Sequence, residues 1–363
     1  MAAPTPIADA LAGWAAAARA AEQPLPDKFP CAACGIDRIV NAKSGTIRKH
    51  KAAKSDVLPC PGSGAPVLSA RVPARSARGY YKDPETGDRY PSVTTLLDKG
   101  MAKAALSFWA AKVVAETAMD NLPAMLASSR TPEEREEFIK WLKNEPIRRR
   151  DDRGDIGRAV HRLIEARILG EPPPAQLASN PEFAPYIDHF HDAVRTWKLR
   201  FRASEMVVAH PGENYAGTLD YIVTSPLLAE ALSLPPRSLL MGDTKTGGEL
   251  DRVVYSGHKH GVYPQAGAQM AAYRAAPVGW LRDGTRIDMP ECAPIAVVLH
   301  LRPEGWRLYP ARCGDDMFQV FKGAQFMADF ETYRSKNVIG EALTPPAPTS
   351  DAGDATTGRK DVA

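Results

Sequence analysis

Three segments determine the fold: residues 215–224 read YAGTLDYIVT, residues 238–245 read SLLMGDTK, and residues 265–275 read QAGAQMAAYRA. The first alternates apolar side chains and the second is a short apolar run, so both are predicted to be β-strands. The third is predicted to be a helix, on which Gln269 and Tyr273 share a face because they are four residues apart. The chain is therefore predicted to have an α/β core with acidic residues on two strands.

The acidic residues on the two strands suit a hard metal ion. On a strand Asp243 and Lys245 point the same way, and Thr244 points back into the sheet, which leaves its carbonyl beside Asp243. Carboxylates such as Asp220 and Asp243, with a carbonyl, are ligands that Mg²⁺ or Mn²⁺ prefers. A lysine beside such an ion can orient or deprotonate an attacking water. An isolated Asp-x-Lys is usually a solvated pair, so the prediction of phosphodiester hydrolysis depends on all three segments together.

A histidine on an earlier helix is a candidate fourth member. Residues 154–165 read GDIGRAVHRLIE, and the apolar stripe of this helix leaves His161 at its edge. Taken alone, a histidine at such an edge is more often packed or hydrogen-bonded than a metal ligand. Glu165 lies one turn further on the same side and is predicted to fix the His161 tautomer.

Over residues 80–335 these motifs resemble the RecB-like branch of the PD-(D/E)XK nuclease superfamily, which includes CRISPR-associated RecB-like exonucleases. The marks are a histidine on an early helix, Gly-x-x-Asp, Asp-x-Lys and Gln-x-x-x-Tyr. Here they fall at His161, 217–220, 243–245 and 269–273. The resemblance implies a restriction-endonuclease-like core, a mixed β-sheet flanked by helices, with extra N-terminal helices. It also implies a DNA exonuclease of the phage recombination or replication type.

The resemblance also implies roles for single residues. The catalytic Mg²⁺ or Mn²⁺ would be held by four groups: His161, Asp220, Asp243 and the Thr244 carbonyl. Lys245 would help water attack the phosphate, while Gln269 and Tyr273 would position the lysine or the DNA strand. Glu205 resembles an acidic position of relatives. Some relatives hold an iron–sulfur cluster, but Cys292 and Cys313 stand alone, so none is expected here.

A second metal site is predicted near the N-terminus. Cys31, Cys34, His50 and Cys60 supply three thiolates and one imidazole, which form a tetrahedral structural Zn²⁺ site. The competing interpretations are a redox pair or a disulfide. The spacing departs from that of the common two-Cys, two-His finger, so no base-reading helix is predicted. The basic residues around His50 either contact phosphates or form a solvated face.

Composition and charge limit the classes of protein to which this chain can belong. The chain has 363 residues, 44% of them hydrophobic, and a net charge of +3, with basic clusters at 43–54, 148–153 and 195–202. These clusters predict contact with DNA, as linear ends or single strands, and recombination or replication proteins are possible further partners. No apolar run reaches the ~18 residues of a membrane span, and the N-terminus lacks a secretion signal. The expected location is the cytoplasm, that of the host if the protein is phage-encoded.

Five regions are expected along the chain. They are a helical extension at 1–27 with a helix at 7–22, a zinc-finger-like module at 28–65, a linker at 66–79, the nuclease domain at 80–340 and a disordered tail at 341–363.

Within the nuclease domain, helices are expected from Val93 to about Met119, at 132–142 and from Gly154. Residues 225–237 are predicted to overhang the cleft, and 246–262 to be a loop that orders on substrate. A competing function is a zinc-stabilised DNA-binding or recruitment module that no longer cuts. The intact Asp220, Asp243 and Lys245 favour the enzyme.

Overall fold

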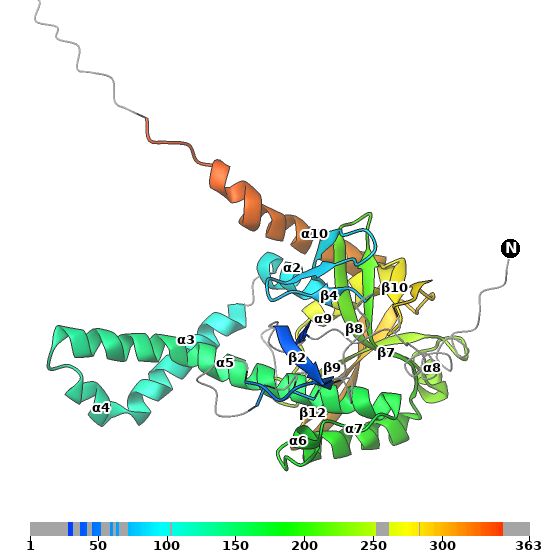
Figure 1. Ribbon diagram of the computed structural model, residues 1–363, viewed down its shortest axis with the longest axis horizontal. Coiled ribbons are helices and arrows are strands. Elements are labelled where there is room, and N and C mark those ends of the chain that lie inside the picture. Colours follow the sequence, from blue (N-terminus) through cyan, green and yellow to red (C-terminus); the bar gives the residue numbers. More distant parts are fainter. Residues whose placement is uncertain are drawn as a thin grey trace, which may run out of the picture.

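The computed structural model describes residues 28–31, 37–41, 46–51, 59–60, 63–64, 72–101, 104–251, 261–282 and 284–343 (Figure 1). Its largest sheet has seven strands in the order β11-β10-β7-β8-β9-β12-β13. Only β9 and β12 pair in parallel. The predicted α/β class, a mixed sheet flanked by helices, is confirmed. The strands are β7 (Arg200–His210), β8 (Tyr215–Thr224), β9 (Leu240–Lys245), β10 (Val278–Trp280), β11 (Arg286–Asp288), β12 (Ile295–Arg302) and β13 (Gly305–Arg312).

Helices cover both faces of this sheet because its central strands are apolar on both sides. On β12, Ala296 and Val298 pack against one helical layer, and Leu299 and Leu301 pack against the other. The first layer contains α2 (Val93–Gly100), α9 (Gln265–Ala275) and α10 (Asp315–Asp329). The second contains the C-terminal part of α5 (Pro132–Leu169) together with α7 (Ala184–Trp197), and the short α6 (Ala175–Ala178) follows α5 in the chain.

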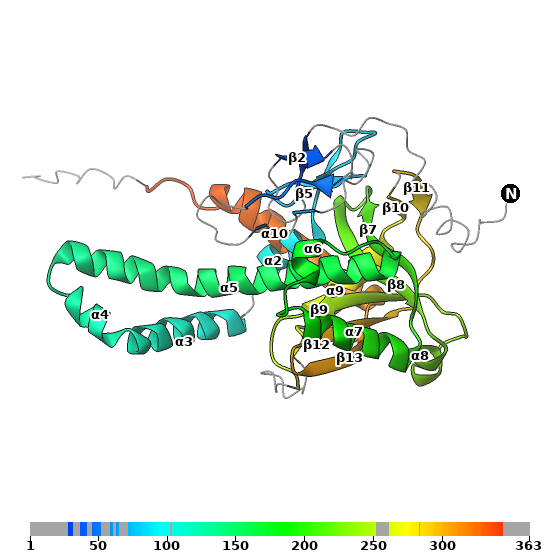
Figure 2. The ribbon, with the colours of Figure 1, turned by 60° about the horizontal axis from the view of Figure 1, so that its bottom comes forward.

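A helical hairpin projects from the body in both views (Figures 1 and 2). This arm consists of α3 (Ala104–Asp120), α4 (Leu122–Ala127) and residues 132–153 of α5. The 38 residues of α5 make a helix about 57 Å long at 1.5 Å per residue. Its C-terminal end carries His161 back to the sheet.

Two of the predicted helix boundaries were wrong. The helix expected from Val93 to Met119 is interrupted after Gly100, where a Cβ would lie 1.9 Å from the Ala324 carbonyl oxygen, so glycine lets α2 touch α10. The helices expected at 132–142 and from Gly154 are one helix that continues through Pro146. Glu145, just before this proline, binds both Arg148 and Arg149 just after it, and these pairs help the helix to continue.

Two small sheets precede the main domain. The first contains β1 (Lys28–Pro30), β2 (Asp37–Asn41) and β3 (Thr46–Ile47), and the second β4 (Ala74–Arg75), β5 (Tyr80–Lys82) and β6 (Arg89–Pro91). Tyr81 and Tyr90 of the second sheet pack against Trp280 of β10 and against strands β7 and β8 of the main sheet. The linker predicted at 66–79 therefore ends earlier, because Val72 is buried in this cluster and β4 is paired with β5.

The segment after β8 differs from its prediction. Residues 226–231 form α8 (Pro226–Ala231), capped by Ser225, and Leu228 packs with Tyr221 and Leu240 in an apolar cluster. It therefore joins the core instead of overhanging a cleft. Strands β10 and β11 were not predicted, because three-residue strands show too little alternation to recognise.

Several predictions fall outside the described residues: the helix at 7–22, Cys34, residues 252–260 of the loop expected at 246–262, and the tail from 344. Within the described part of the chain, no helix combines the length and apolar character needed to cross a bilayer.

Candidate active site

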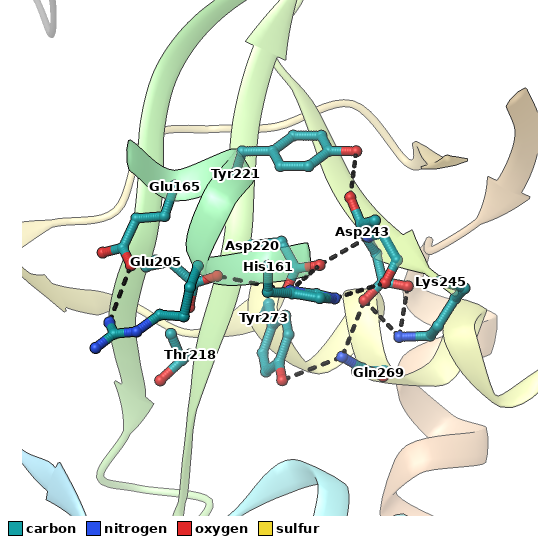
Figure 3. A network of polar contacts seen from close by, with 12 residues as sticks. His161, Glu165, Glu205, Thr218, Asp220, Tyr221, Asp243, Lys245, Gln269 and Tyr273 are labelled. Atoms are coloured by element: carbon teal, nitrogen blue, oxygen red, sulfur yellow. Dashed lines mark hydrogen bonds and ion pairs between the residues drawn. The ribbon is translucent and has the colours of Figure 1, made fainter. Parts of the chain in front are cut away.

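The site lies where β8 and β9 separate. The two strands pair only from Tyr221 to Val223 and from Leu240 to Gly242. Beyond Gly242 the backbone amide of Thr244 donates to Asp220 Oδ2 at 2.7 Å, so a side chain replaces the next bond of the ladder. The carboxylates of Asp220 and Asp243 therefore face the opening between the strands (Figure 3).

Three side chains from three different elements meet in this opening. His161 comes from α5, Glu205 from β7 and Asp220 from β8, and their ligand atoms all lie within 4.8 Å of one another. His161 Nδ1 is 3.5 Å from Asp220 Oδ2 and 3.7 Å from Glu205 Oε1. This is the arrangement expected of groups that can share one cation.

Glu205 reaches the cluster through an unusual backbone conformation. Its φ is +48°, in the left-handed region that non-glycine residues rarely adopt. Such a conformation costs on the order of 1 kcal/mol and persists where the surrounding structure holds it. The strand register places Glu205 level with Asp220, since Ser204 pairs with Tyr221 and Met206 with Leu219. Sequence alternation cannot reveal this placement.

The contacts of His161 define which nitrogen is available. Its Nε2 lies 3.0 Å from the Thr244 carbonyl oxygen, which can only accept a hydrogen bond, so Nε2 carries a proton. In the neutral tautomer Nδ1 then presents a lone pair toward Glu205 and Asp220. The Thr244 carbonyl, which the resemblance implies is a metal ligand, accepts this hydrogen bond and so orients His161.

A second group of side chains surrounds Asp243. Lys245 Nζ lies 2.7 Å from both carboxylate oxygens of the buried Asp243. The Gln269 amide donates to Asp243 Oδ1 at 3.4 Å and to the Tyr273 hydroxyl at 3.3 Å. Asp243 Oδ2 is buried and has no hydrogen-bond partner among the described residues besides its ion pair with Lys245. All six predicted catalytic side chains thus lie at this opening (Figure 3).

The electrostatics show an excess of buried negative charge. Burial lowers the pKa of His161, but Asp220 and Glu205 outweigh this and raise it to about 9. Burial raises the pKa of Glu205 to about 7, against the opposing effect of His161. Burial also raises the pKa of Asp243, and although it lowers that of Lys245, the nearby carboxylates raise the lysine's pKa overall. The site thus stabilises cations.

The predicted role of Glu165 was wrong. Its carboxylate binds Arg162 and Arg282 and, within the described residues, makes no hydrogen bond to His161. Arg282 also bonds Glu171 at 2.6 Å, so it ties the C-terminal end of α5 to the segment after β10. Neither arginine carries a sequence signal that would have identified this network.

Sequence reasoning also missed two hydroxyl groups at the site. Tyr81 of β5 is buried and its hydroxyl lies 2.9 Å from Thr218 Oγ1, two residues before Asp220. Glu205 is close enough to help raise the pKa of Tyr81, after burial as the main cause. The second small sheet therefore borders the site.

Three of the four predicted zinc ligands lie among the described residues. Ligand atoms of Cys31, His50 and Cys60 lie within 4.8 Å of one another, and the two sulfurs are 3.7 Å apart. His50 Nδ1 lies 2.9 Å from the Arg48 carbonyl, which leaves Nε2 as the candidate ligand. Two thiols and an imidazole at these separations fit a tetrahedral zinc site, for which the sequence offers Cys34 as the fourth ligand.

The basic cluster at 148–153 is largely neutralised. Arg148 and Arg149 bind Glu145, and Arg150 binds Asp151. These pairs lie within one helix, so this stretch has little net charge to offer a phosphate backbone.

The chain matches no protein-family model and no curated protein.

Proposed function

We propose that the protein is a Mg²⁺- or Mn²⁺-dependent nuclease that hydrolyses phosphodiester bonds in DNA, of the RecB-like exonuclease type. The observation that carries the proposal is the meeting of His161, Glu205 and Asp220 beside the Asp243–Lys245 pair, in the opening between β8 and β9. Hard oxygen ligands with one imidazole suit Mg²⁺ or Mn²⁺.

The residues present fit a divalent cation. His161 Nδ1, Glu205 and Asp220 would hold it, and Asp243 Oδ2, which pairs with Lys245, is a fourth candidate ligand. When bound, the cation would polarise the phosphate and lower the pKa of water. The proton on His161 is the counter-charge that a cation would replace, which agrees with the raised pKa of this side chain.

The other residues would position the reactants. Lys245 keeps its proton because Asp243 stabilises the ammonium, so it can neutralise the phosphate as negative charge develops there. The hydrogen bond from Gln269 to Asp243 joins α9 to β9 beside Lys245, and the bond from Gln269 to the Tyr273 hydroxyl lies within α9. We assign a structural Zn²⁺ to the Cys31–His50–Cys60 cluster, with Cys34 as the fourth ligand.

The test is cleavage of end-labelled linear DNA, single- and double-stranded, with circular DNA alongside. We expect Mg²⁺- or Mn²⁺-dependent release of nucleotides from linear DNA, reduced about a hundredfold or more by Lys245→Ala, because charge at the phosphate is no longer neutralised. Lys140→Ala, an exposed lysine of the arm, is the matched control and should cut like wild type. Absence of metal-dependent cutting, or full activity of Lys245→Ala, would contradict the proposal and favour a DNA-binding module.

A further inference from the structure

Helix α3 is more apolar than an exposed helix should be. Its 17 residues include only three charged ones, Lys112, Glu116 and Asp120, which recur every four residues and so form a single stripe. A helix that is apolar over most of its circumference is normally buried. Here only one side is covered: Val113 and Thr117 face α5, and Arg149 donates to the Thr117 hydroxyl.

The opposite side of α3 is an exposed apolar face. Phe108 and Met119 are 74% and 71% exposed, and Ala111 and Ala115 between them are also exposed. At about 100° per residue, these four residues fall within an arc of roughly 80°, centred opposite Val113. We call these four residues the α3 seam. Nothing in the described part of the chain covers the seam, and the arm stands clear of the sheet in Figure 2.

The order of residues along the seam is self-complementary. The large side chains, Phe108 and Met119, lie at its ends, and the alanines lie in its middle. In an antiparallel pair with a two-fold axis at the height of residues 113–114, Ala111 meets Ala115 of the partner subunit. Phe108 then lies beside Met119 of the partner subunit. Alanines at the crossing let two helices approach to about 8 Å, and the large ends then pack across the contact.

The charged stripe matches the same arrangement. Lys112 and Glu116 lie on either side of that axis, so Lys112 faces Glu116 of the partner subunit, twice over by symmetry. The two side chains already approach to 3.5 Å within one helix and are 72% and 49% exposed, so both can reach across. A partner of unrelated sequence would not require this symmetry.

We propose that the α3 seam is a homodimer interface, in which the arms of two copies pack antiparallel through Phe108, Ala111, Ala115 and Met119. The contact is isologous, because the same surface serves on both copies. It leaves the opening between β8 and β9 outside the interface, so the inference is independent of the proposed function.

Charge reversal in the full-length protein tests this interface. Sedimentation velocity should show a dimer for wild type. Lys112→Glu and Glu116→Lys should each weaken the dimer at least about tenfold, because each places four like charges together. An equimolar mixture of the two variants should restore it, since the two acidic groups of one chain then face the two basic groups of the other. Intrahelical pairing cannot explain that rescue.

The controls separate this result from misfolding. Lys143→Glu changes an exposed lysine on the outer part of α5 and should remain dimeric. Far-ultraviolet circular dichroism should be unchanged in every variant, because the substituted side chains are exposed. A wild type that is monomeric at every concentration would overturn the proposal. So would single variants as dimeric as wild type, or a mixture that stays monomeric.

Discussion

Gly242 is the residue that lets β9 approach β8 just before the strands separate. A Cβ at this position would lie 1.8 Å from Cε2 of the buried Tyr221 ring. That ring has little freedom to move, because Tyr221 is fully buried and its hydroxyl accepts a hydrogen bond from Thr244 at 3.3 Å. Packing against Tyr221 therefore explains why the residue before Asp243 has no side chain, and a stability measurement can test this explanation.

We expect Gly242→Ala to lower the free energy of unfolding by about 1–3 kcal/mol, the usual cost of forcing a methyl group into a packed core. Urea denaturation gives the value. Gly247→Ala is the matched control, because nothing lies within 4 Å of a Cβ there, and it should change stability by about 0.5 kcal/mol or less. Equal stabilities for the two variants would show that Tyr221 does not constrain Gly242.

At the same scale, sequence analysis located most of the site but not its contacts. Asp220, Asp243 and Lys245 lie together because strand periodicity fixes which way their side chains point. Glu205 could not be placed, since its position depends on a left-handed backbone. The true partner of Glu165, Arg282, is 117 residues away in the sequence, and no local pattern encodes such a pair.

At the scale of elements, local patterns predicted helices well but not where they end. Pro146 would normally end a helix, yet α5 continues through it because ion pairs and the contact with α3 support the far side. The two small N-terminal sheets were also hard to predict from local patterns. With two to five residues per strand they have little core of their own, and the first has a candidate metal cluster in its place.

Elemental analysis of the purified protein tests that cluster. We expect one equivalent of zinc per chain in wild type and its loss in Cys60→Ser, because a serine hydroxyl is a poor zinc ligand. Cys313→Ser is the matched control: Cys313 is equally buried but bonds only a backbone carbonyl, so zinc content should be unchanged. A zinc-free wild type, or zinc retained in Cys60→Ser, would contradict the assignment.

At the scale of the whole molecule, the mixed sheet follows from the sequence because β8, β9 and β12 alternate or run apolar, as the strands of a covered sheet do. The arm could not be predicted from the sequence, since only the tertiary structure shows that α3 leaves the core. The sheet and both helical layers converge on one opening, to which α5, β7, β8, β9 and α9 each contribute a side chain.

The central claim is that these side chains bind one or more divalent cations, and titration calorimetry with Mn²⁺ tests it most directly. We predict binding to wild type that is weakened at least about tenfold by Asp220→Asn and by Glu205→Gln, and unchanged by Asp288→Asn, an exposed carboxylate on β11. Wild type that binds no Mn²⁺, or site variants that bind it as tightly as wild type, would contradict the account.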